Sequence, residues 1–197
     1  MIQIEDEILT RCQGGDKAAF QWVVQTYQRM LFSLALKMLA DEEEAKDVVQ
    51  DTFVRAWLAI RNYNPQQPFT SWLYTIASRL CLNRMKAGSA GVLARYGCGR
   101  GRPRSQPEDL TVLHRFASGD DTQRKLENDE WVAIVRTLAE GLSEKQRLVF
   151  TLCQLEGLSS EEAEQITGMD ARQIKSNLYV ARQTIRKRLK DLGYDED

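Results

Sequence analysis

The sequence has few of the residues that hold metal ions or build disulfide frameworks. It contains one histidine and four cysteines, and no two cysteines form a C-x-x-C pair. The cysteines are Cys12, Cys81, Cys98 and Cys153. A structural zinc site needs closely spaced Cys and His ligands, and a disulfide framework is typical of short secreted chains. We therefore expect no metal, no cofactor and reduced thiols in a cytoplasmic protein.

Long apolar runs are also missing. No stretch of roughly 18 apolar residues occurs, which is the length that a membrane-spanning helix needs. The N-terminal run MIQIEDEILTRCQ is acidic and has no apolar centre, so we expect neither a signal peptide nor membrane insertion.

The chain also lacks a G-x-x-x-x-G-K phosphate loop and a G-x-S-x-G nucleophile elbow. These absences favour a protein that is not an enzyme.

The alternation of Val, Ile and Thr that is typical of strands is missing as well, and helical periodicity dominates. Four expected helix starts carry a capping box, in which a short polar side chain and a Glu or Gln three residues later bind each other's backbone amides. These pairs are Asp41–Glu44, Ser143–Gln146, Ser159–Glu162 and Asp170–Gln173. We predict helices near residues 5–13, 17–39, 42–62, 70–87, 122–139, 144–156, 160–167 and 171–191. The predicted fold class is all-α.

A change of composition separates two sets of helices. The segment from Ala87 to Asp109 holds five glycines and two prolines and has no repeating apolar face. Glycine widens the range of backbone conformations, so such a segment is typical of a flexible linker. We expect two small helical domains, over residues 1–88 and 128–197, joined by a flexible linker over 89–127.

The formal net charge is only −1, but the charges are unevenly distributed. Residues 171–190 include seven basic residues and no acidic one, whereas residues 41–51 include six acidic residues and one lysine. This asymmetry suggests two partners of different character, one of them nucleic acid. Charge runs also occur on ordinary solvated faces. The placement of the side chains on each helix therefore has to distinguish a binding surface from a solvated one.

The basic run lies in a pattern typical of a helix-turn-helix. In LSSEEAEQITGMDARQIKSNLYVARQTIRKRL, residues 158–189, a short helix is followed by Gly168 and then by a longer capped helix. The apolar side of the longer helix holds Ile174, Leu178, Ala181, Ile185 and Leu189. The opposite side carries Arg172, Lys175, Ser176, Tyr179, Arg182 and Arg186 and no acid. Cations bind phosphates, and Ser, Arg and Lys reach base edges, so this side is predicted to bind DNA.

The acidic run begins a helix with two different faces. The buried face is predicted to contain Ala45, Val49, Thr52, Phe53, Ala56 and Ile60. The other face carries Asp47, Asp51, Val54 and Leu58, with Gln50 and Trp57 at its edge. Two aliphatic side chains among acids on the solvent side suit docking to a basic protein partner. Single exposed apolar residues are also common, so the pattern alone leaves both interpretations open.

The stretch PFTSWLYTIASRLCLNRMK, residues 68–86, is predicted to be a helix with an unusual flank. Its core side is expected to hold Phe69, Leu73, Ile76, Ala77 and Leu80. One flank holds Trp72, Thr75, Arg79, Asn83 and Lys86, with Ser71 and Ser78 beyond it. Aromatic faces stack on bases, cations hold phosphates and amides bind base edges, so the flank suits unpaired nucleic acid. The alternative is that Trp72 fills the seam to a neighbouring helix.

Several motifs occur in the order of one protein family. The motifs are GGDKAAFQWVVQTYQ (14–28), DVVQDTFVRAW (47–57), FTSWLYTIASRLCLN (69–83), LSEKQRLVFTLCQLEGLSSEEA (142–163) and IKSNLYVAR (174–182). Together they resemble bacterial extracytoplasmic-function (ECF) sigma factors, over both expected domains but not over the linker and tails. The resemblance implies sigma regions two and four. It also implies a transcription initiation factor that binds core RNA polymerase, directs it to promoters and promotes DNA melting, as an alternative sigma factor for a stress or envelope response.

The resemblance also implies roles for individual residues. It assigns Asp47, Gln50, Asp51, Phe53 and Trp57 to the polymerase contact, with Val54 and Leu58 beside them. It assigns Asn62, Tyr63, Asn64, Trp72, Thr75, Arg79 and Asn83 to the −10 element. It assigns Arg172, Lys175, Ser176 and Tyr179 to the −35 element, and we expect Gln173, Arg182 and Arg186 of the same helix to bind there as well. Core RNA polymerase and promoter DNA are therefore the expected partners, and an anti-sigma factor is expected by family habit.

The sequence departs from the family in the first helix of the helix-turn-helix. The family has an aromatic, a larger aliphatic and an alanine at the positions of Ser160, Ala163 and Glu164, so the packing of that helix stays open.

The alternative function is a helix-turn-helix regulator whose N-terminal domain senses a ligand or dimerises. A sensor needs a pocket or a dimer seam, whereas DVVQDTF and WLYTIA favour polymerase and open DNA.

Overall fold

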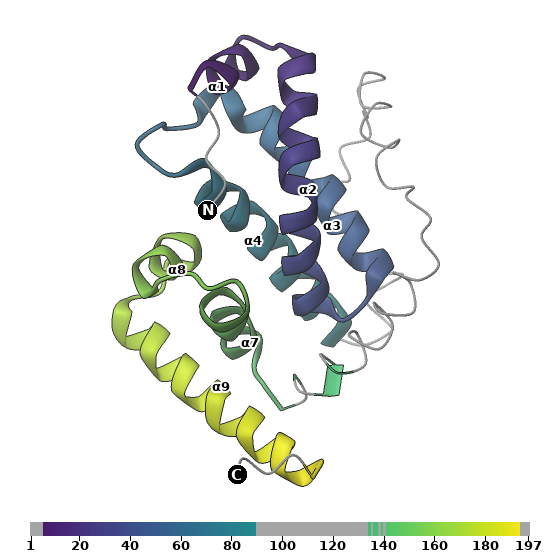
Figure 1. Cartoon of the computed structure of the whole chain (residues 1–197), viewed down its shortest axis with the longest axis vertical. Helices are drawn as coiled ribbons and strands as arrows, with labels where there is room; N and C mark the ends of the chain where they lie inside the picture. The colour runs from purple at the N-terminus through teal and green to yellow at the C-terminus, as the bar shows by residue number, and fades with distance from the viewer. Residues whose placement is uncertain (1–5, 90–133, 135, 138, 140, 194–197) are drawn as a thin grey trace.

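The computed structural model describes residues 6–89, 134, 136, 137, 139 and 141–193, and this part of the chain is helical without a strand (Figure 1). The N-terminal domain contains α1 (Asp6–Gln13), α2 (Lys17–Leu39), α3 (Glu42–Ala59), the 3-10 helix η1 (Ile60–Asn62) and α4 (Phe69–Ser89). The C-terminal domain contains α7 (Glu144–Phe150), the π-helical turn η5 (Thr151–Leu155), α8 (Ser160–Thr167) and α9 (Ala171–Asp191). The predicted all-α fold class is confirmed. Every described helix is too short or too polar to cross a lipid bilayer.

The predicted helix ranges agree closely with the observed ones where the structure describes them. The helix predicted over 42–62 is divided into α3 and η1, and the helix predicted over 144–156 is divided into α7 and η5. The predicted linker over 89–127, apart from its first residue, lies outside the described residues, as does most of the helix predicted over 122–139. The domain limits and the flexibility of the linker therefore stay predictions.

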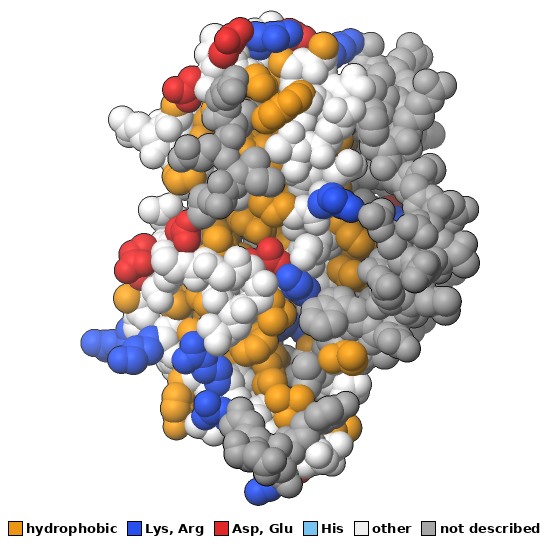
Figure 2. Space-filling model, viewed as in Figure 1, with side chains coloured by type: hydrophobic (Ala, Val, Ile, Leu, Met, Phe, Trp, Pro, Cys, Tyr) orange, Lys and Arg blue, Asp and Glu red, His pale blue; other side chains and the backbone are white. Residues whose placement is uncertain are grey.

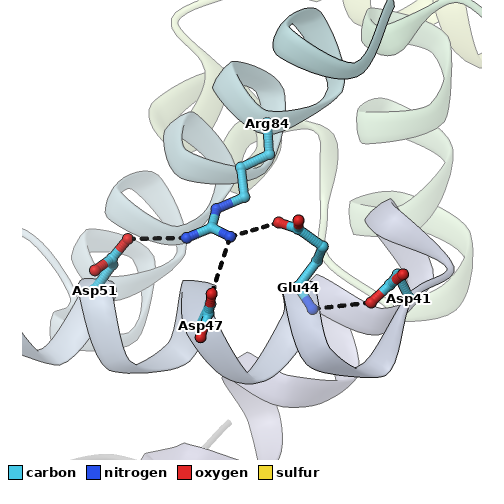
Figure 3. Close-up of polar contacts among 5 residues, drawn as sticks. All are labelled: Asp41, Glu44, Asp47, Asp51 and Arg84. Carbon is cyan, nitrogen blue, oxygen red and sulfur yellow. Dashed lines mark hydrogen bonds and ion pairs between the residues drawn. The ribbon is translucent and has the colours of Figure 1, made fainter. Parts of the chain in front are cut away.

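Capping boxes begin the helices of the C-terminal domain. In all three expected boxes, at Ser143, Ser159 and Asp170, the cap side chain accepts the amide three residues on and the Glu or Gln there accepts the cap amide. The expected box at Asp41 is only half formed. Asp41 accepts the Glu44 amide at 2.9 Å, but the Glu44 carboxylate pairs with Arg84 of α4 instead of turning back (Figure 3).

The core of the N-terminal domain lies between α2, α3 and α4. On α4 the structure confirms the burial of Phe69, Leu73, Ala77 and Leu80, while Ile76 is half-buried. On α3 the predicted stripe is confirmed except at one position. At that position Val49 is only half-buried, and the preceding residue, Val48, is fully buried instead. The buried side of α3 is therefore centred on Val48 and not on Val49.

The helix-turn-helix of the C-terminal domain is formed by α8 and α9. Gly168 ends α8 with φ 71°, a left-handed backbone conformation that glycine adopts without strain. Ala163 is fully buried and packs in one cluster with Val149 and Ile174. The small side chain at position 163 therefore packs inside the helix-turn-helix.

The two domains pack directly against each other, an arrangement that the sequence did not reveal. Figure 1 shows α7 and α8 beside α4, and α8 makes the larger part of this contact. Leu148, Leu152 and Ile166 of the C-terminal domain are buried in the same core cluster as the N-terminal helices. The described parts of both domains therefore share one apolar core.

A polar cluster also joins the domains at Glu156, directly after η5. Lys37 of α2 donates to the Glu156 carboxylate at 2.7 Å, Ser33 donates to it at 3.3 Å, and the Tyr74 hydroxyl donates at 3.0 Å. The Lys37 and Glu156 side chains are only 14% and 10% exposed. Burial and the neighbouring Glu156 carboxylate raise the pKa of the Tyr74 hydroxyl above its ordinary value. Nearby, Arg147 donates to the Met38 carbonyl at 2.7 Å.

Candidate polymerase and DNA interfaces

The exposed face of α3 has the mixture of charges and aliphatic groups that the sequence predicts. The Asp47 and Asp51 side chains are 63% and 53% exposed, Leu58 is 63% exposed, and Val54 and Gln50 are half-buried. Leu58 is therefore largely exposed although the opposite side of α3 is well packed. Among the described residues, this face of α3 is accessible to solvent.

Two aromatic residues assigned to the polymerase contact, Phe53 and Trp57, pack against the core of the N-terminal domain. Phe53 is 2% exposed and makes an edge contact with Phe20, with ring centroids 6.4 Å apart. Trp57 is half-buried and tilts over Phe20, with centroids 4.9 Å apart. Only the outer edge of Trp57 is therefore available at the α3 face.

Sequence reasoning missed a cation at this acidic face. Arg84 of α4 reaches across to α3, where one guanidinium nitrogen pairs with Glu44 and lies 3.4 Å from Asp47, and the other lies 3.1 Å from Asp51 (Figure 3). The clue in the sequence is that Arg84 stands one helical turn beyond the buried Leu80, which places it on the packed side of α4.

Two of the three residues assigned to the segment between α3 and α4 are exposed. Asn62 and Asn64 are exposed, but Tyr63 is 6% exposed. The Tyr63 ring lies against Phe69 and Trp72, with centroids 5.2 and 5.0 Å apart, and its hydroxyl donates to the Gln67 carbonyl. Tyr63 therefore shapes the loop in this structure, and it would have to leave the aromatic cluster to reach a base.

The predicted flank of α4 lies on one side of the helix. Arg79 and Asn83 are exposed, and Thr75 and Trp72 are half-buried. The Thr75 hydroxyl donates to the Ser71 carbonyl at 2.9 Å. One side of the Trp72 ring packs on the aromatic cluster, and the residue is only half-buried. Trp72 therefore fills the core on one side and leaves part of its ring for stacking.

Ser71 and Ser78 do not extend this flank. They are 1% and 2% exposed. Both lie one helical turn from Tyr74, which bonds to Glu156, so they share the side of α4 that faces the C-terminal domain. The Ser78 hydroxyl has no hydrogen-bond partner among the described residues. Their predicted place beside the flank is wrong, because the sequence could not show that a second domain covers them.

The predicted DNA-binding face of α9 is open and cationic, and Figure 2 shows Lys and Arg side chains gathered over this helix. The residues Arg172, Gln173, Lys175, Ser176, Tyr179, Arg182 and Arg186 are all exposed. Several of them line a shallow groove of about 420 Å³. Gln173 also closes the capping box at the start of α9, and Arg182 donates to Gln154 at 3.2 Å.

No group of three or more His, Cys, Asp or Glu side chains suited to a metal ion occurs in the part of the chain that the structure describes. The chemistry of the three surfaces is that of recognition: carboxylates and aliphatic groups on α3, an aromatic and amide flank on α4, and cations on α9. A helix-turn-helix whose second helix has an exposed cationic side, joined to a helical domain with an exposed acidic face, is typical of a DNA-binding transcription factor.

Comparison with known proteins gives the family. The Sigma-70 region 2 model matches residues 23–90, and the Sigma-70 region 4 model matches residues 133–185. The chain is 31% identical to the RNA polymerase sigma-H factor of Pseudomonas aeruginosa, over 95% of each protein. It is 30% identical to the ECF RNA polymerase sigma-E factor of Escherichia coli K12, over 96% of this chain and 97% of that protein. The chain belongs to the ECF sigma factors, and it is a transcription initiation factor.

Solved structures with the same fold include CnrH in complex with the cytosolic domain of CnrY, with a TM-score of 0.65, 23% identity, and coverage of 93% of this chain and 96% of that one. The sigma factor RpoE in complex with the anti-sigma factor NepR from Bartonella quintana has a TM-score of 0.61 and 23% identity, and covers 87% of this chain and 96% of that one. At this identity the two structures establish the shared fold.

Proposed function

We propose that the chain performs its sigma-factor function through three surfaces. The acidic and apolar face of α3 binds core RNA polymerase, the flank of α4 with residues 62–64 binds the −10 element, and the exposed face of α9 binds the −35 element. The observation that carries this proposal is the face of α9, whose cations are exposed with no acid among them. That arrangement suits the phosphates and base edges of a major groove.

At the −10 element, we infer that Arg79 and Asn83 make the outermost contacts and that Trp72 offers one face of its ring. Asn62 and Asn64 are placed for a base that has left the duplex, since both amide side chains are exposed at the loop. Unpaired bases are recognised by this combination of stacking and amide hydrogen bonding.

We also propose an anti-sigma partner, a cytoplasmic location and a role without catalysis. The support for the partner is that both structural relatives were solved as complexes, one of them with a protein named as an anti-sigma factor. The domain limits proposed are 1–88 and 128–197 with a linker over 89–127, which agrees in outline with the two matched regions. The helix-turn-helix regulator with a sensing domain is the less favoured function, because both sigma regions match.

The docking proposal predicts that Leu58→Glu weakens binding to core polymerase at least about tenfold, as expected for an apolar anchor near the centre of an interface. Leu58 is 63% exposed, so the substitution should leave the fold intact. The measurement is the dissociation constant of the purified chain for core polymerase. Leu192→Glu is the matched control, because Leu192 is 52% exposed and lies beyond the end of α9.

Leu58 is a cleaner test of docking than Asp51. Asp51→Arg would place a second cation against Arg84 and would strain the contact between α3 and α4. If Leu58→Glu binds core polymerase as tightly as Leu192→Glu does, then α3 does not dock to the polymerase through this face.

The −35 proposal predicts that Arg172→Ala and Lys175→Ala each weaken promoter binding. A residue that reads a base edge should lose about 1–3 kcal/mol and should relax the preference at one base pair. A residue that binds phosphate should weaken all sequences alike and reduce the salt slope by about 1. Holoenzyme binding to a mapped promoter at several salt concentrations separates the two, with Lys145→Ala, an exposed cation outside this face, as the control. Unchanged binding in both variants would show that the recognition face is wrongly assigned.

A further inference from the structure

Arg84 contacts three carboxylates on successive turns of α3. Its two terminal nitrogens reach Glu44, Asp47 and Asp51, and its own side chain is 26% exposed (Figure 3). Arg84 comes from α4, so this contact joins the helix assigned to the −10 element to the helix assigned to polymerase. The contact also explains why Glu44 leaves the capping box at Asp41 incomplete.

The acidic side chains on this face would otherwise repel one another. Glu44, Asp47 and Asp51 are separated by three and four positions, the spacing at which like charges on a helix face each other and destabilise it. Lys46, the lysine in the same run, is paired with Glu42 at 2.8 Å and with Glu43 at 2.9 Å. The cation that offsets this repulsion comes from another helix, at Arg84.

We propose that Arg84 is a positioning residue for polymerase docking: it holds Asp47 and Asp51 in one orientation and presents them to core polymerase as a pair. This inference rests on the docking role proposed above for α3. Polymerase approaches from the solvent side, and Arg84 supports the carboxylates from the side of α4.

The geometry leaves both aspartates able to bind a second cation. Asp47 and Asp51 each face Arg84 with Oδ2, and their side chains remain 63% and 53% exposed. An ionised carboxylate has about four acceptor positions on two oxygens, so one contact leaves the outer oxygen free. A partner that meets fixed carboxylates does not have to order them on binding, which is the general advantage of a preorganised site.

The planar fork of arginine is what allows this contact. One guanidinium spans two helical turns because its nitrogens point in fixed, separate directions, whereas a lysine ammonium is a single point charge. The inference therefore distinguishes Arg84→Gln, which removes the charge and the fork, from Arg84→Lys, which keeps the charge alone.

The test measures association and dissociation rate constants of the full chain with core polymerase, for Arg84→Gln, Arg84→Lys and the wild type. We expect Arg84→Gln to dissociate about 3–10 times faster, the size of effect expected when a side chain that was held in place has to be ordered at the interface. Association should be equal or faster, because the face becomes more negative and electrostatic steering by a basic partner depends on net charge. Arg84→Lys should lie between the two. Arg29→Gln, which removes an exposed arginine from α2, is the matched control.

A purely structural role would give a different result. If Arg84 only ties α4 to α3, Arg84→Gln should lower the melting temperature of the chain and the fraction competent to bind, while the dissociation rate of the bound fraction stays at the wild-type value. That outcome would overturn the inference. Full restoration by Arg84→Lys would overturn the fork as its cause, since charge alone would then suffice.

The proposed docking face is tested in the same experiment. If Leu58→Glu weakens binding and Arg84→Gln leaves the dissociation rate unchanged, the docking face stands and only the positioning role fails. If Leu58→Glu binds like the wild type, the docking face itself is wrong, and the role of Arg84 falls with it.

Discussion

Glu156→Ala is expected to separate the two domains of the free protein. The substitution leaves Lys37 nearly buried without its counter-ion and removes the acceptor of Tyr74 and Ser33 at the same time. Removing one partner of a buried ion pair costs about 3–5 kcal/mol, because the other charge remains out of water. The shared apolar contact of Leu148, Leu152 and Ile166 remains and opposes this loss, which should fall first on the packing of α7 and α8 against α2 and α4.

Small-angle scattering and amide exchange measure this separation directly. The radius of gyration of Glu156→Ala should rise, and the amides of α8 should exchange faster, while the helical content stays constant. Glu156→Gln should lie closer to the wild type, since its amide oxygen still accepts hydrogen bonds. Glu161→Ala is the matched control, because it removes an exposed acid from the same domain. A compact Glu156→Ala protein with unchanged exchange would show that the apolar contact alone holds the domains together.

The contact at Glu156 marks the limit of what the sequence could predict about this fold. Helix starts and ends were predictable because their causes are local: the boxes at Ser143, Ser159 and Asp170 bind amides three residues away. Glu156, in contrast, bonds to residues that are 123, 119 and 82 positions away in the chain. A single glutamate in the run QLEGLSS is typical of a solvated turn, and nothing near it in the sequence indicates a buried partner.

The candidate site was predictable to the level of helix faces and less well at single positions. The exposed side of α9 agrees at every assigned residue, because a helix with one apolar stripe and one polar side has one way to pack. Tyr63, Ser71 and Ser78 are buried instead of exposed, because the aromatic cluster covers the first and the second domain covers the other two. Arg84 was missed because its role depends on α3 lying beside α4, which is a tertiary contact.

The second large effect is expected at Trp72. This residue lies at the boundary of the two functions of α4: one side of its ring packs against Tyr63 and Phe69, with centroids 5.0 and 5.4 Å apart, and the residue is half-buried. The exposed part can stack on a base only after the DNA strands have parted, because duplex DNA hides the base faces. Stacking on an aromatic side chain is worth about 1–3 kcal/mol per base. Trp72→Ala should therefore reduce promoter opening by a factor of about 5 to 150, while binding to the closed promoter stays nearly intact.

Permanganate footprinting on a duplex promoter and on a pre-melted promoter separates stacking from folding. Trp72→Ala should fail to open the duplex but should form a normal complex on pre-melted DNA, where the cost of parting the strands has been removed. Trp72→Phe keeps an aromatic face and should retain most of the opening. Trp22→Ala is the matched control, because Trp22 is 38% exposed on α2 and has no assigned role in DNA binding. If pre-melted DNA does not rescue Trp72→Ala, or if this variant melts far below Trp22→Ala, then Trp72 serves the aromatic cluster of the core, and the separated strand is held by other residues of the flank.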